Sequence, residues 1–513
     1  MAKTVQALVL GGYTGASWFR RYRKLCLALL TFFCIFYGFA FTILYQVFLL
    51  QLAAPVVVGT LFLVWLLPDR RNISTRPLEI LLFTFLFVLL VWPDYLAVAL
   101  PGLPWITALR LTSIPLLLVF AISYSSSADI RAQMKEIYNS IPLPFKLFAA
   151  FVAIQFLSIG LSAELNSSLN KFINAQLGWT AIWLIACLVF LKPARIGQLA
   201  SLIWVCVLIN GFIGLWEQRL GAVPWAGHVP SFLAVGDESV QRILRGASRA
   251  AVGTHRVQAK FSTPLGLGEF MALATPFIAY FVFYGRNLAV RALAVATLVL
   301  MMMNVRAADS RLGTIGMSLG LMLFVALWAF ERWRTRRESL IAPAIILTYP
   351  AIFALLVASS FFVKRIRNFM WGSGAQAASD AGRQEQLTKG IAKLAERPWG
   401  YGIGRSADVL GVRNPEGVLT IDNYYVATWL DYGLIGFALY FSMFYYVIYR
   451  AIRLYPSLVD NQRKMAGVII ISLTLFVIEK WSFNQQDTHP LVFAMFGAII
   501  AIISINTPRA KKA

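Results

Sequence analysis

Two arginine-rich segments interrupt an otherwise apolar chain, at residues 217–262 and 364–421. Guanidinium groups carry a permanent charge and a planar fork of donors that matches phosphate oxygens, so these segments predict a phosphate-bearing ligand. The alternative is simple contact with anionic lipid. The cations of the first segment are Arg219, Arg242, Arg245, Arg249, Arg256 and Lys260; those of the second include Arg383, Lys389, Lys393, Arg397, Arg405 and Arg413.

Helical spacing relates three of these arginines. Arg242, Arg245 and Arg249 stand at positions i, i+3 and i+7, so one helix would present them on a single face. Such a helix would lie on the membrane at the depth of the phosphates, either as a ligand site or as an interfacial anchor.

Metal ligands are not evident in the arginine-rich segments. They contain neither an Asp-x-Asp pair nor a histidine cluster of ligand spacing, so we expect no metal and no other cofactor. The four cysteines all lie within apolar runs, where they behave as small hydrophobic residues.

Composition places these segments in a membrane protein. Of 513 residues, 59% are hydrophobic and only 13% charged, and the mean hydropathy is +0.69, too apolar for the wetted surface of a soluble domain. The net charge of +23 comes from cations at the ends of apolar runs rather than on one basic face. We therefore expect an all-α polytopic membrane protein that does not bind nucleic acid.

Apolar stretches of about 20 residues, the length that crosses a bilayer, predict about fourteen spans (12–14). The first run, 25–67, is long enough for a hairpin of two helices that turns at Pro55. The other predicted spans are 77–98, 106–123, 145–161, 177–191, 199–215, 265–284, 290–303, 312–330, 341–363, 424–449, 466–483 and 491–505.

Basic residues predict the orientation of these spans, because lysine and arginine in short connections resist translocation. Alternate connections are basic, which puts both termini in the cytoplasm and residues 217–262 and 364–421 outside, as two large periplasmic loops of a single membrane domain, 1–513. The N-terminal apolar run is too long for a cleaved signal peptide. Within the 265–284 span, Glu269 is predicted to pair with an arginine of another span, such as Arg110.

Four motifs in the second half of the chain occur in an order that is typical of one family. They are 255–272 "HRVQAKFSTPLGLGEFMA", 308–316 "ADSRLGTIG", 383–404 "RQEQLTKGIAKLAERPWGYGIG" and 422–439 "DNYYVATWLDYGLIGFAL". Residues 242–449 thereby resemble the O-antigen ligase and polysaccharide polymerase family, the Wzy-type and WaaL-type bacterial membrane glycosyltransferases.

The resemblance implies a GT-C-like helical fold that acts on glycans carried by undecaprenyl diphosphate, at the outer leaflet of the bacterial inner membrane. The expected partners are this lipid-linked oligosaccharide, membrane lipid and a chain-length regulator protein. Arg256 and Arg311 match family positions that hold the diphosphate, followed by Arg383, with Arg249 and Arg245 in the same set. Because a diphosphate leaves as an anion, cations at these places would stabilise the transition state.

Glycosyl transfer also needs a group that orients and deprotonates the acceptor hydroxyl. Ligases that this family contains usually carry histidine before the asparagine of the late helix, whereas this chain has Asp422 before Asn423. Asp422 is either that base or an N-cap of the following helix. Asn423, Tyr424 and Trp399 are predicted to contact the acceptor or its sugars, although an interfacial aromatic belt would also explain the two aromatic residues.

The departure at Asp422 favours a polysaccharide polymerase, which transfers a growing glycan from undecaprenyl diphosphate to another lipid-linked repeat unit. One alternative is a ligase that transfers finished glycan to lipid A core or protein. A lipid-linked oligosaccharide flippase is a third possibility, disfavoured because ionisable residues within the predicted spans are few.

Overall fold

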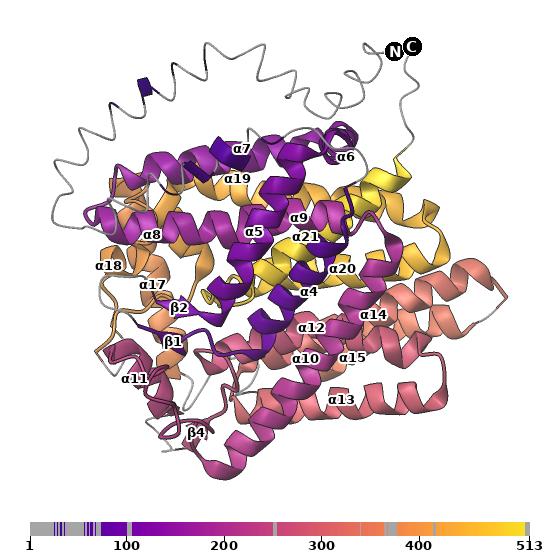
Figure 1. Cartoon of the computed structure of the whole chain (residues 1–513). Coiled ribbons are helices and arrows are strands. Elements are labelled where there is room, and N and C mark those ends of the chain that lie inside the picture. Colours follow the sequence, from indigo (N-terminus) through magenta and orange to yellow (C-terminus); the bar gives the residue numbers. More distant parts are fainter. Residues whose placement is uncertain are drawn as a thin grey trace, which may run out of the picture.

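The computed structural model describes residues 73–99, 105–249, 254–338, 340–363, 377–413 and 417–507, with single positions before residue 68 and residue 367. It is an all-α bundle of long helices that run side by side (Figure 1). Two short antiparallel ribbons, β1–β2 and β3–β4, are the sheets of the described part.

The first half of the bundle contains short elements between long helices. In chain order these are α4 (Arg76–Val91), β1 (Ala97–Val98), β2 (Ile106–Thr107), α5 (Ala108–Ser126), α6 (Ala128–Ser140), α7 (Pro142–Ile159), α8 (Leu165–Ala175), the π-helical turn η1 (Gln176–Ala181), α9 (Ile182–Val189), α10 (Pro193–Leu220), α11 (Glu238–Arg245), β3 (Ala247–Arg249) and β4 (Thr254–Arg256).

The second half begins at a Pro-initiated helix. Its elements are α12 (Pro264–Tyr284), α13 (Leu288–Ala307), α14 (Arg311–Thr335), α15 (Ile341–Phe362), α17 (Ala377–Glu396), α18 (Ser406–Leu410), α19 (Tyr424–Leu454), the 3₁₀ turn η3 (Tyr455–Ser457), α20 (Asp460–Glu479) and α21 (His489–Asn506).

Eleven helices among the described residues are long and apolar enough to cross a membrane. They match the predicted spans from 106–123 onward, and the 77–98 span corresponds to the shorter α4 of 16 residues. The predicted hairpin at 25–67 lies outside the described residues, apart from single positions. The chain is thus a polytopic membrane protein built from helices.

Helix α12 lies at the centre of the second half and packs against α13, α14 and α20. Buried residues make up 78% of its apolar window, against 6% in α15, so α12 is a core helix and α15 a peripheral one. Small residues let α12 and α14 approach closely: a Cβ atom added to Gly313 would lie 2.9 Å from the Cα of Gly268. This contact fixes the start of α14 against the start of α12.

Helix α19 is broken near its beginning. Gly433 has φ +69°, a conformation that glycine adopts without strain, and the turn 398–404 packs into the break. Leu434 N–H donates to the Pro398 carbonyl at 3.0 Å, and Tyr401 N–H donates to the Leu430 carbonyl at 2.7 Å. The backbone amides of this turn therefore bond to α19.

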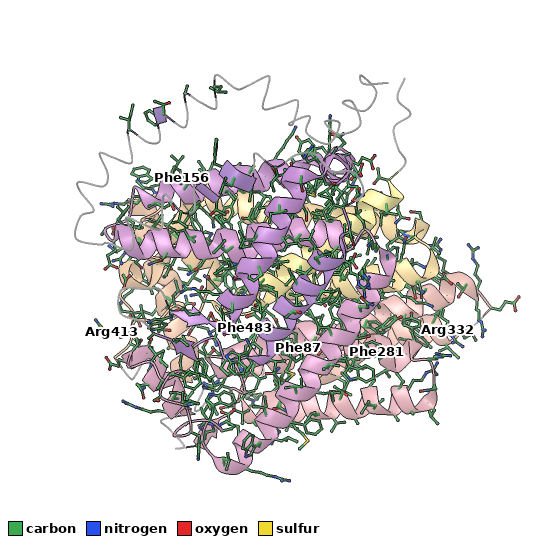
Figure 2. The ribbon with its side chains drawn as sticks, viewed as in Figure 1. Phe87, Phe156, Phe281, Arg332, Arg413 and Phe483 are labelled. Carbon is green, nitrogen blue, oxygen red and sulfur yellow. The ribbon has the colours of Figure 1, made fainter. Side chains whose placement is uncertain are left out.

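The bundle has two distinct ends. Helices α11, α17 and α18 lie together at one end, and the connection from α14 to α15 lies at the other (Figure 1). Arg413 and Arg332 mark these two ends in Figure 2. The end that carries α11, α17 and α18 contains the arginine-rich segments predicted to face outward.

Candidate functional site

A buried carboxylate anchors the loop between β4 and α12. Glu217, in the last turn of α10, is 0% exposed. Its carboxylate accepts hydrogen bonds from Ala259 N–H at 2.7 Å and Gln258 N–H at 3.2 Å, and His255 Nε2 lies 2.8 Å from its Oε1. Charge-assisted bonds of this kind compensate for the burial of the carboxylate. The loop that follows Arg256 is therefore held in one conformation.

Arg256 lies against the loop that precedes α14. Its Nε donates to the Ala308 carbonyl at 3.0 Å and its Nη2 to the Asp309 carbonyl at 3.4 Å. The backbone supports this contact, because Val257 N–H donates to the Ala307 carbonyl at 3.2 Å. Arg256 thus lies beside the segment that leads into Arg311, the first residue of α14.

The start of α14 is capped by a serine. Ser310 Oγ accepts a hydrogen bond from Gly313 N–H, and Asp309 adopts φ +48°, which is unusual for a residue other than glycine. Both Arg256 and Arg311 are half-buried. The tight loop before the cap therefore sets the position of Arg311 relative to Arg256.

Asp422 directly follows the second arginine-rich segment and bonds to helix α17. Its backbone N–H donates to Gln386 Oε1 at 2.9 Å, and Arg383 stands one turn before Gln386 on α17. Burial raises the pKa of Asp422 above its ordinary value, while the positive charges of Arg383 and, more weakly, Arg256 oppose this shift. The positive charges of Arg383 and Arg256 therefore both act on Asp422.

The N-cap of α19 is Asn423, which corrects the alternative that Asp422 caps this helix. Asn423 Oδ1 accepts hydrogen bonds from Tyr425 N–H at 2.9 Å and Val426 N–H at 3.1 Å. Asn423, which was predicted to contact the acceptor or its sugars, uses its side-chain oxygen to begin the helix. The Asp422 carboxylate does not cap this helix.

The two aromatic residues predicted to contact sugars differ in exposure. Trp399 is 63% exposed, whereas Tyr424 is 2% exposed and packs against Tyr440 and His489. Tyr424 belongs to the core in this structure because the helix start turns it inward. Trp399 has the exposure that a sugar contact needs.

The predicted helical face of Arg242, Arg245 and Arg249 is wrong. Helix α11 ends at Arg245, because Gly246 takes φ +78°, and Arg249 belongs to strand β3, where it pairs with Thr254. Arg245 is exposed on α11. Helix α11 packs on β1 through an apolar cluster that includes Val240, so it is held by protein contacts.

Several cations of the 364–421 segment have acidic partners. Arg405 Nη1 lies 2.7 Å from Glu164 Oε2 and 3.0 Å from Asp408 Oδ2, which joins the loop before α18 to the start of α8. Lys389 pairs with Glu385 and Lys393 with Glu396 along α17. These pairs reduce the number of cations in this segment that could bind a ligand.

A second buried carboxylate has a different partner from the one predicted. Glu269 Oε1 lies 2.8 Å from Lys480 Nζ, and both side chains are 0% exposed, whereas Arg110 donates to the Trp105 carbonyl. Lys480 also accepts a hydrogen bond at its own carbonyl from Tyr424 N–H, at 3.0 Å. The pair therefore joins α12 to the loop after α20 and, through the backbone, to the start of α19.

Sequence reasoning missed the residues that support the site. Glu217 follows the predicted 199–215 span directly, and a carboxylate at such a place is a recognisable signal. The sequence indicated a role for Gln386 more weakly, only through its position three residues after Arg383, on the same face of a helix. Nothing in the sequence indicated that Lys480, predicted inside the 466–483 span, faces Glu269.

A comparison with known protein families places part of the chain. Residues 296–441 match the model described as O-antigen ligase. The match runs from α13 into α19 and contains Arg311, Arg383 and Asp422, whereas Arg256 and Glu217 precede it. No curated protein matches the chain. The motifs at 308–316, 383–404 and 422–439 all lie within the matched segment.

Proposed function

We propose that this member of the O-antigen ligase family is a polysaccharide polymerase. The family is a glycosyltransferase-like class of enzyme. The proposed reaction transfers a growing glycan from undecaprenyl diphosphate to another lipid-linked repeat unit, at the outer face of the bacterial inner membrane, with both termini of the chain in the cytoplasm. A chain-length regulator protein is the proposed macromolecular partner.

One arrangement carries the proposal: the charges of Arg383 and Arg256 both act on Asp422, and Arg256 bonds to the loop that leads into Arg311. A carboxylate among guanidinium groups suits a reaction in which one substrate loses a proton and the other releases an anion. Arg256 and Arg311 would bind the diphosphate of the donor. Arg383 would contribute a further positive charge beside Asp422.

The proposed step balances protons and charges. The acceptor hydroxyl oxygen forms a bond to the anomeric carbon of the donor glycan, and the bond from that carbon to the phosphate oxygen breaks. Asp422 takes the hydroxyl proton, and undecaprenyl diphosphate leaves with the electron pair. A carboxyl whose pKa is raised by burial is a stronger base than an ordinary aspartate, which suits this role.

The family description keeps a ligase as the second candidate. A ligase would use the same donor but transfer the glycan to lipid A core or to protein. In a deletion strain, accumulation of lipid-linked polymer would favour the ligase, whereas accumulation of single repeat units would favour the polymerase.

The decisive experiment uses the purified full chain in liposomes with lipid-linked repeat units and measures the length of the glycan products. We expect longer products from the wild type without an energy source, and loss of elongation in Arg256→Ala and Arg311→Ala. Arg219→Ala, which changes an exposed arginine at the end of α10, serves as the matched control. Full-length products from both site variants would overturn the proposed phosphate role.

The proposed orientation has its own test. A cysteine placed at Arg383 should react in intact cells with a thiol reagent that does not cross the inner membrane. Labelling that requires permeabilised cells would put Arg383 in the cytoplasm and contradict the proposal.

A further inference from the structure

A pocket of about 270 Å³ lies at the end of the bundle opposite the candidate site. It is formed where α12 and α14 end and α20 begins, around the turn η3. Arg332, one of its lining residues, is labelled at the far edge of the bundle in Figure 2. The pocket therefore lies where these apolar helices end.

Positive charge dominates the lining. It contains five cations and two carboxylates, Glu331 and Asp460, which leaves an excess of three positive charges at neutral pH. The carboxylates are already engaged: Glu331 accepts hydrogen bonds from the hydroxyls of Tyr284 and Tyr455, and Asp460 pairs with Arg463. Neither is available to neutralise the remaining cations.

Two of these cations lie over aromatic rings. Arg332 stands 5.5 Å from the centroid of Trp328, and Lys464 Nζ stands 4.7 Å from that of Tyr284. Among the described residues, neither forms an ion pair, and the buried Nε of Arg332 has no hydrogen-bond acceptor. A ring holds each cation in place without neutralising its charge. The pocket thus presents positioned donors that lack an anion.

The preference of basic residues for the cytoplasmic side explains why arginines occur at this end. It does not explain a cavity with aromatic walls that is lined by an arginine with an unsatisfied Nε–H donor. A phosphate group would supply the missing acceptor, and Arg332 with Lys464 would bind it through charge-assisted bonds. At the end of the spans, the nearest phosphates belong to membrane lipids.

We propose that this pocket binds the phosphate of an anionic phospholipid in the inner leaflet. The lipid phosphate lies between Arg332 and Lys464, and the acyl chains lie along the exposed apolar surface of the neighbouring helices. The site is separate from the proposed transfer reaction, and its test does not depend on that reaction.

The test is binding of lipid to the purified full chain in neutral detergent, measured by native mass spectrometry. The probes are phosphatidylglycerol, zwitterionic phosphatidylcholine and inorganic phosphate. We expect one phosphatidylglycerol to bind more tightly than the rest, and the double variant Arg332→Gln with Lys464→Gln to weaken that binding about tenfold or more. Phosphatidylcholine and phosphate should bind weakly to both proteins.

A matched control removes the same charge elsewhere. Lys135 and Lys146 are exposed on and near α6, on the same predicted side of the membrane, so Lys135→Gln with Lys146→Gln should leave the tight lipid site intact. Equal losses in the two double variants would reduce the effect to general surface charge and overturn the site. If inorganic phosphate binds to the pocket as tightly as phosphatidylglycerol does, the phospholipid is not the specific ligand of this site.

A less disruptive variant covers the case in which the double variant does not fold. Lys464→Gln alone removes one of the two phosphate contacts and leaves the guanidinium of Arg332 over Trp328. It should weaken phosphatidylglycerol binding while the melting temperature in lipid-free detergent stays near that of the wild type. Unchanged lipid binding in this folded variant would contradict the proposal.

Discussion

Glu217 and Glu269 are both fully buried carboxylates, but different kinds of partner stabilise them. Glu217 accepts hydrogen bonds from the backbone of residues 258 and 259 and contacts His255. Glu269 pairs with the ammonium group of Lys480. One carboxylate therefore relies mainly on backbone donors within a loop, and the other relies on a single opposite charge.

These different partners give the two carboxylates different roles. Glu217 orders the loop that begins at Arg256, so its effect is local to one candidate phosphate ligand. The Glu269–Lys480 pair joins α12 to the loop after α20, and the Lys480 carbonyl bonds to the start of α19. Loss of Glu217 should mainly harm activity, and loss of the buried pair should mainly harm stability.

The largest loss of stability is expected from Lys480→Met. This change leaves Glu269 buried without its counter-charge, close to the buried carboxylate of Glu479, and should destabilise the protein by about 3–5 kcal/mol. Thermal unfolding in detergent measures it. The double variant Lys480→Met with Glu269→Leu should recover most of the loss, because no unpaired charge then remains at position 269. A double variant no more stable than the single one would contradict this account of the pair.

The second-largest loss of stability is expected from Glu217→Ala. Two buried backbone N–H groups lose their acceptor, which should cost about 1–3 kcal/mol. Elongation by folded, inserted protein should fall by a larger factor than stability alone explains, because Arg256 loses its fixed position. Glu217→Gln keeps an acceptor oxygen and should restore part of the activity. If purified Glu217→Ala elongates glycan at the wild-type rate, the positioning role is wrong.

A smaller effect is expected from His255→Ala, which leaves both backbone donors on Glu217. We expect a loss of about 0.5–1.5 kcal/mol, the usual contribution of one hydrogen bond. Thermal unfolding of the single and double variants of Glu217 and His255 gives their coupling. A loss as large as that of Glu217→Ala would show that His255 acts as an essential counter-charge, which would remove the contrast with Glu269.

The smallest effect on stability is expected from Arg383→Gln, since this half-buried side chain lies on the surface helix α17. Its charge opposes the rise in the pKa of Asp422, so its removal should raise that pKa further. If Asp422 acts as the base, activity is lost as the pH falls through this pKa. The acidic limb of the rate profile should therefore move to higher pH. If the acidic limb of the rate profile does not move, Asp422 is not the base in the proton transfer.

Apolar length predicted the helices well, because about 20 apolar residues in a bilayer have few alternatives to a spanning helix. The spans from 106–123 onward correspond to helices for this reason. It was harder to predict which side chains of different spans pair with each other. Glu269 faces Lys480 rather than Arg110 because of how α12 and α20 pack, and spacing along one helix carries no information on its neighbour.

Local backbone chemistry explains the other differences at the site. Gly246 ends α11 before Arg249, which placed that arginine in a strand instead of on the predicted helical face. Asn423 rather than Asp422 caps α19, a difference of one residue between two good capping types. The sequence motifs singled out Asp422, Arg383 and Arg256, and in the structure the charges of both arginines act on Asp422.

The break in α19 has a consequence for how the protein responds to the bilayer. Residues 434–454 alone would extend roughly 30 Å at about 1.5 Å per residue, the thickness of a typical hydrocarbon core. The short helical part before Gly433 is therefore not needed to cross the membrane, and it is bonded to the turn 398–404 and to the Lys480 carbonyl. In a thinner bilayer, an increased tilt of the span after Gly433 would relieve the hydrophobic mismatch, and the contacts of the preceding part with protein would hold the start of α19 beside Asp422.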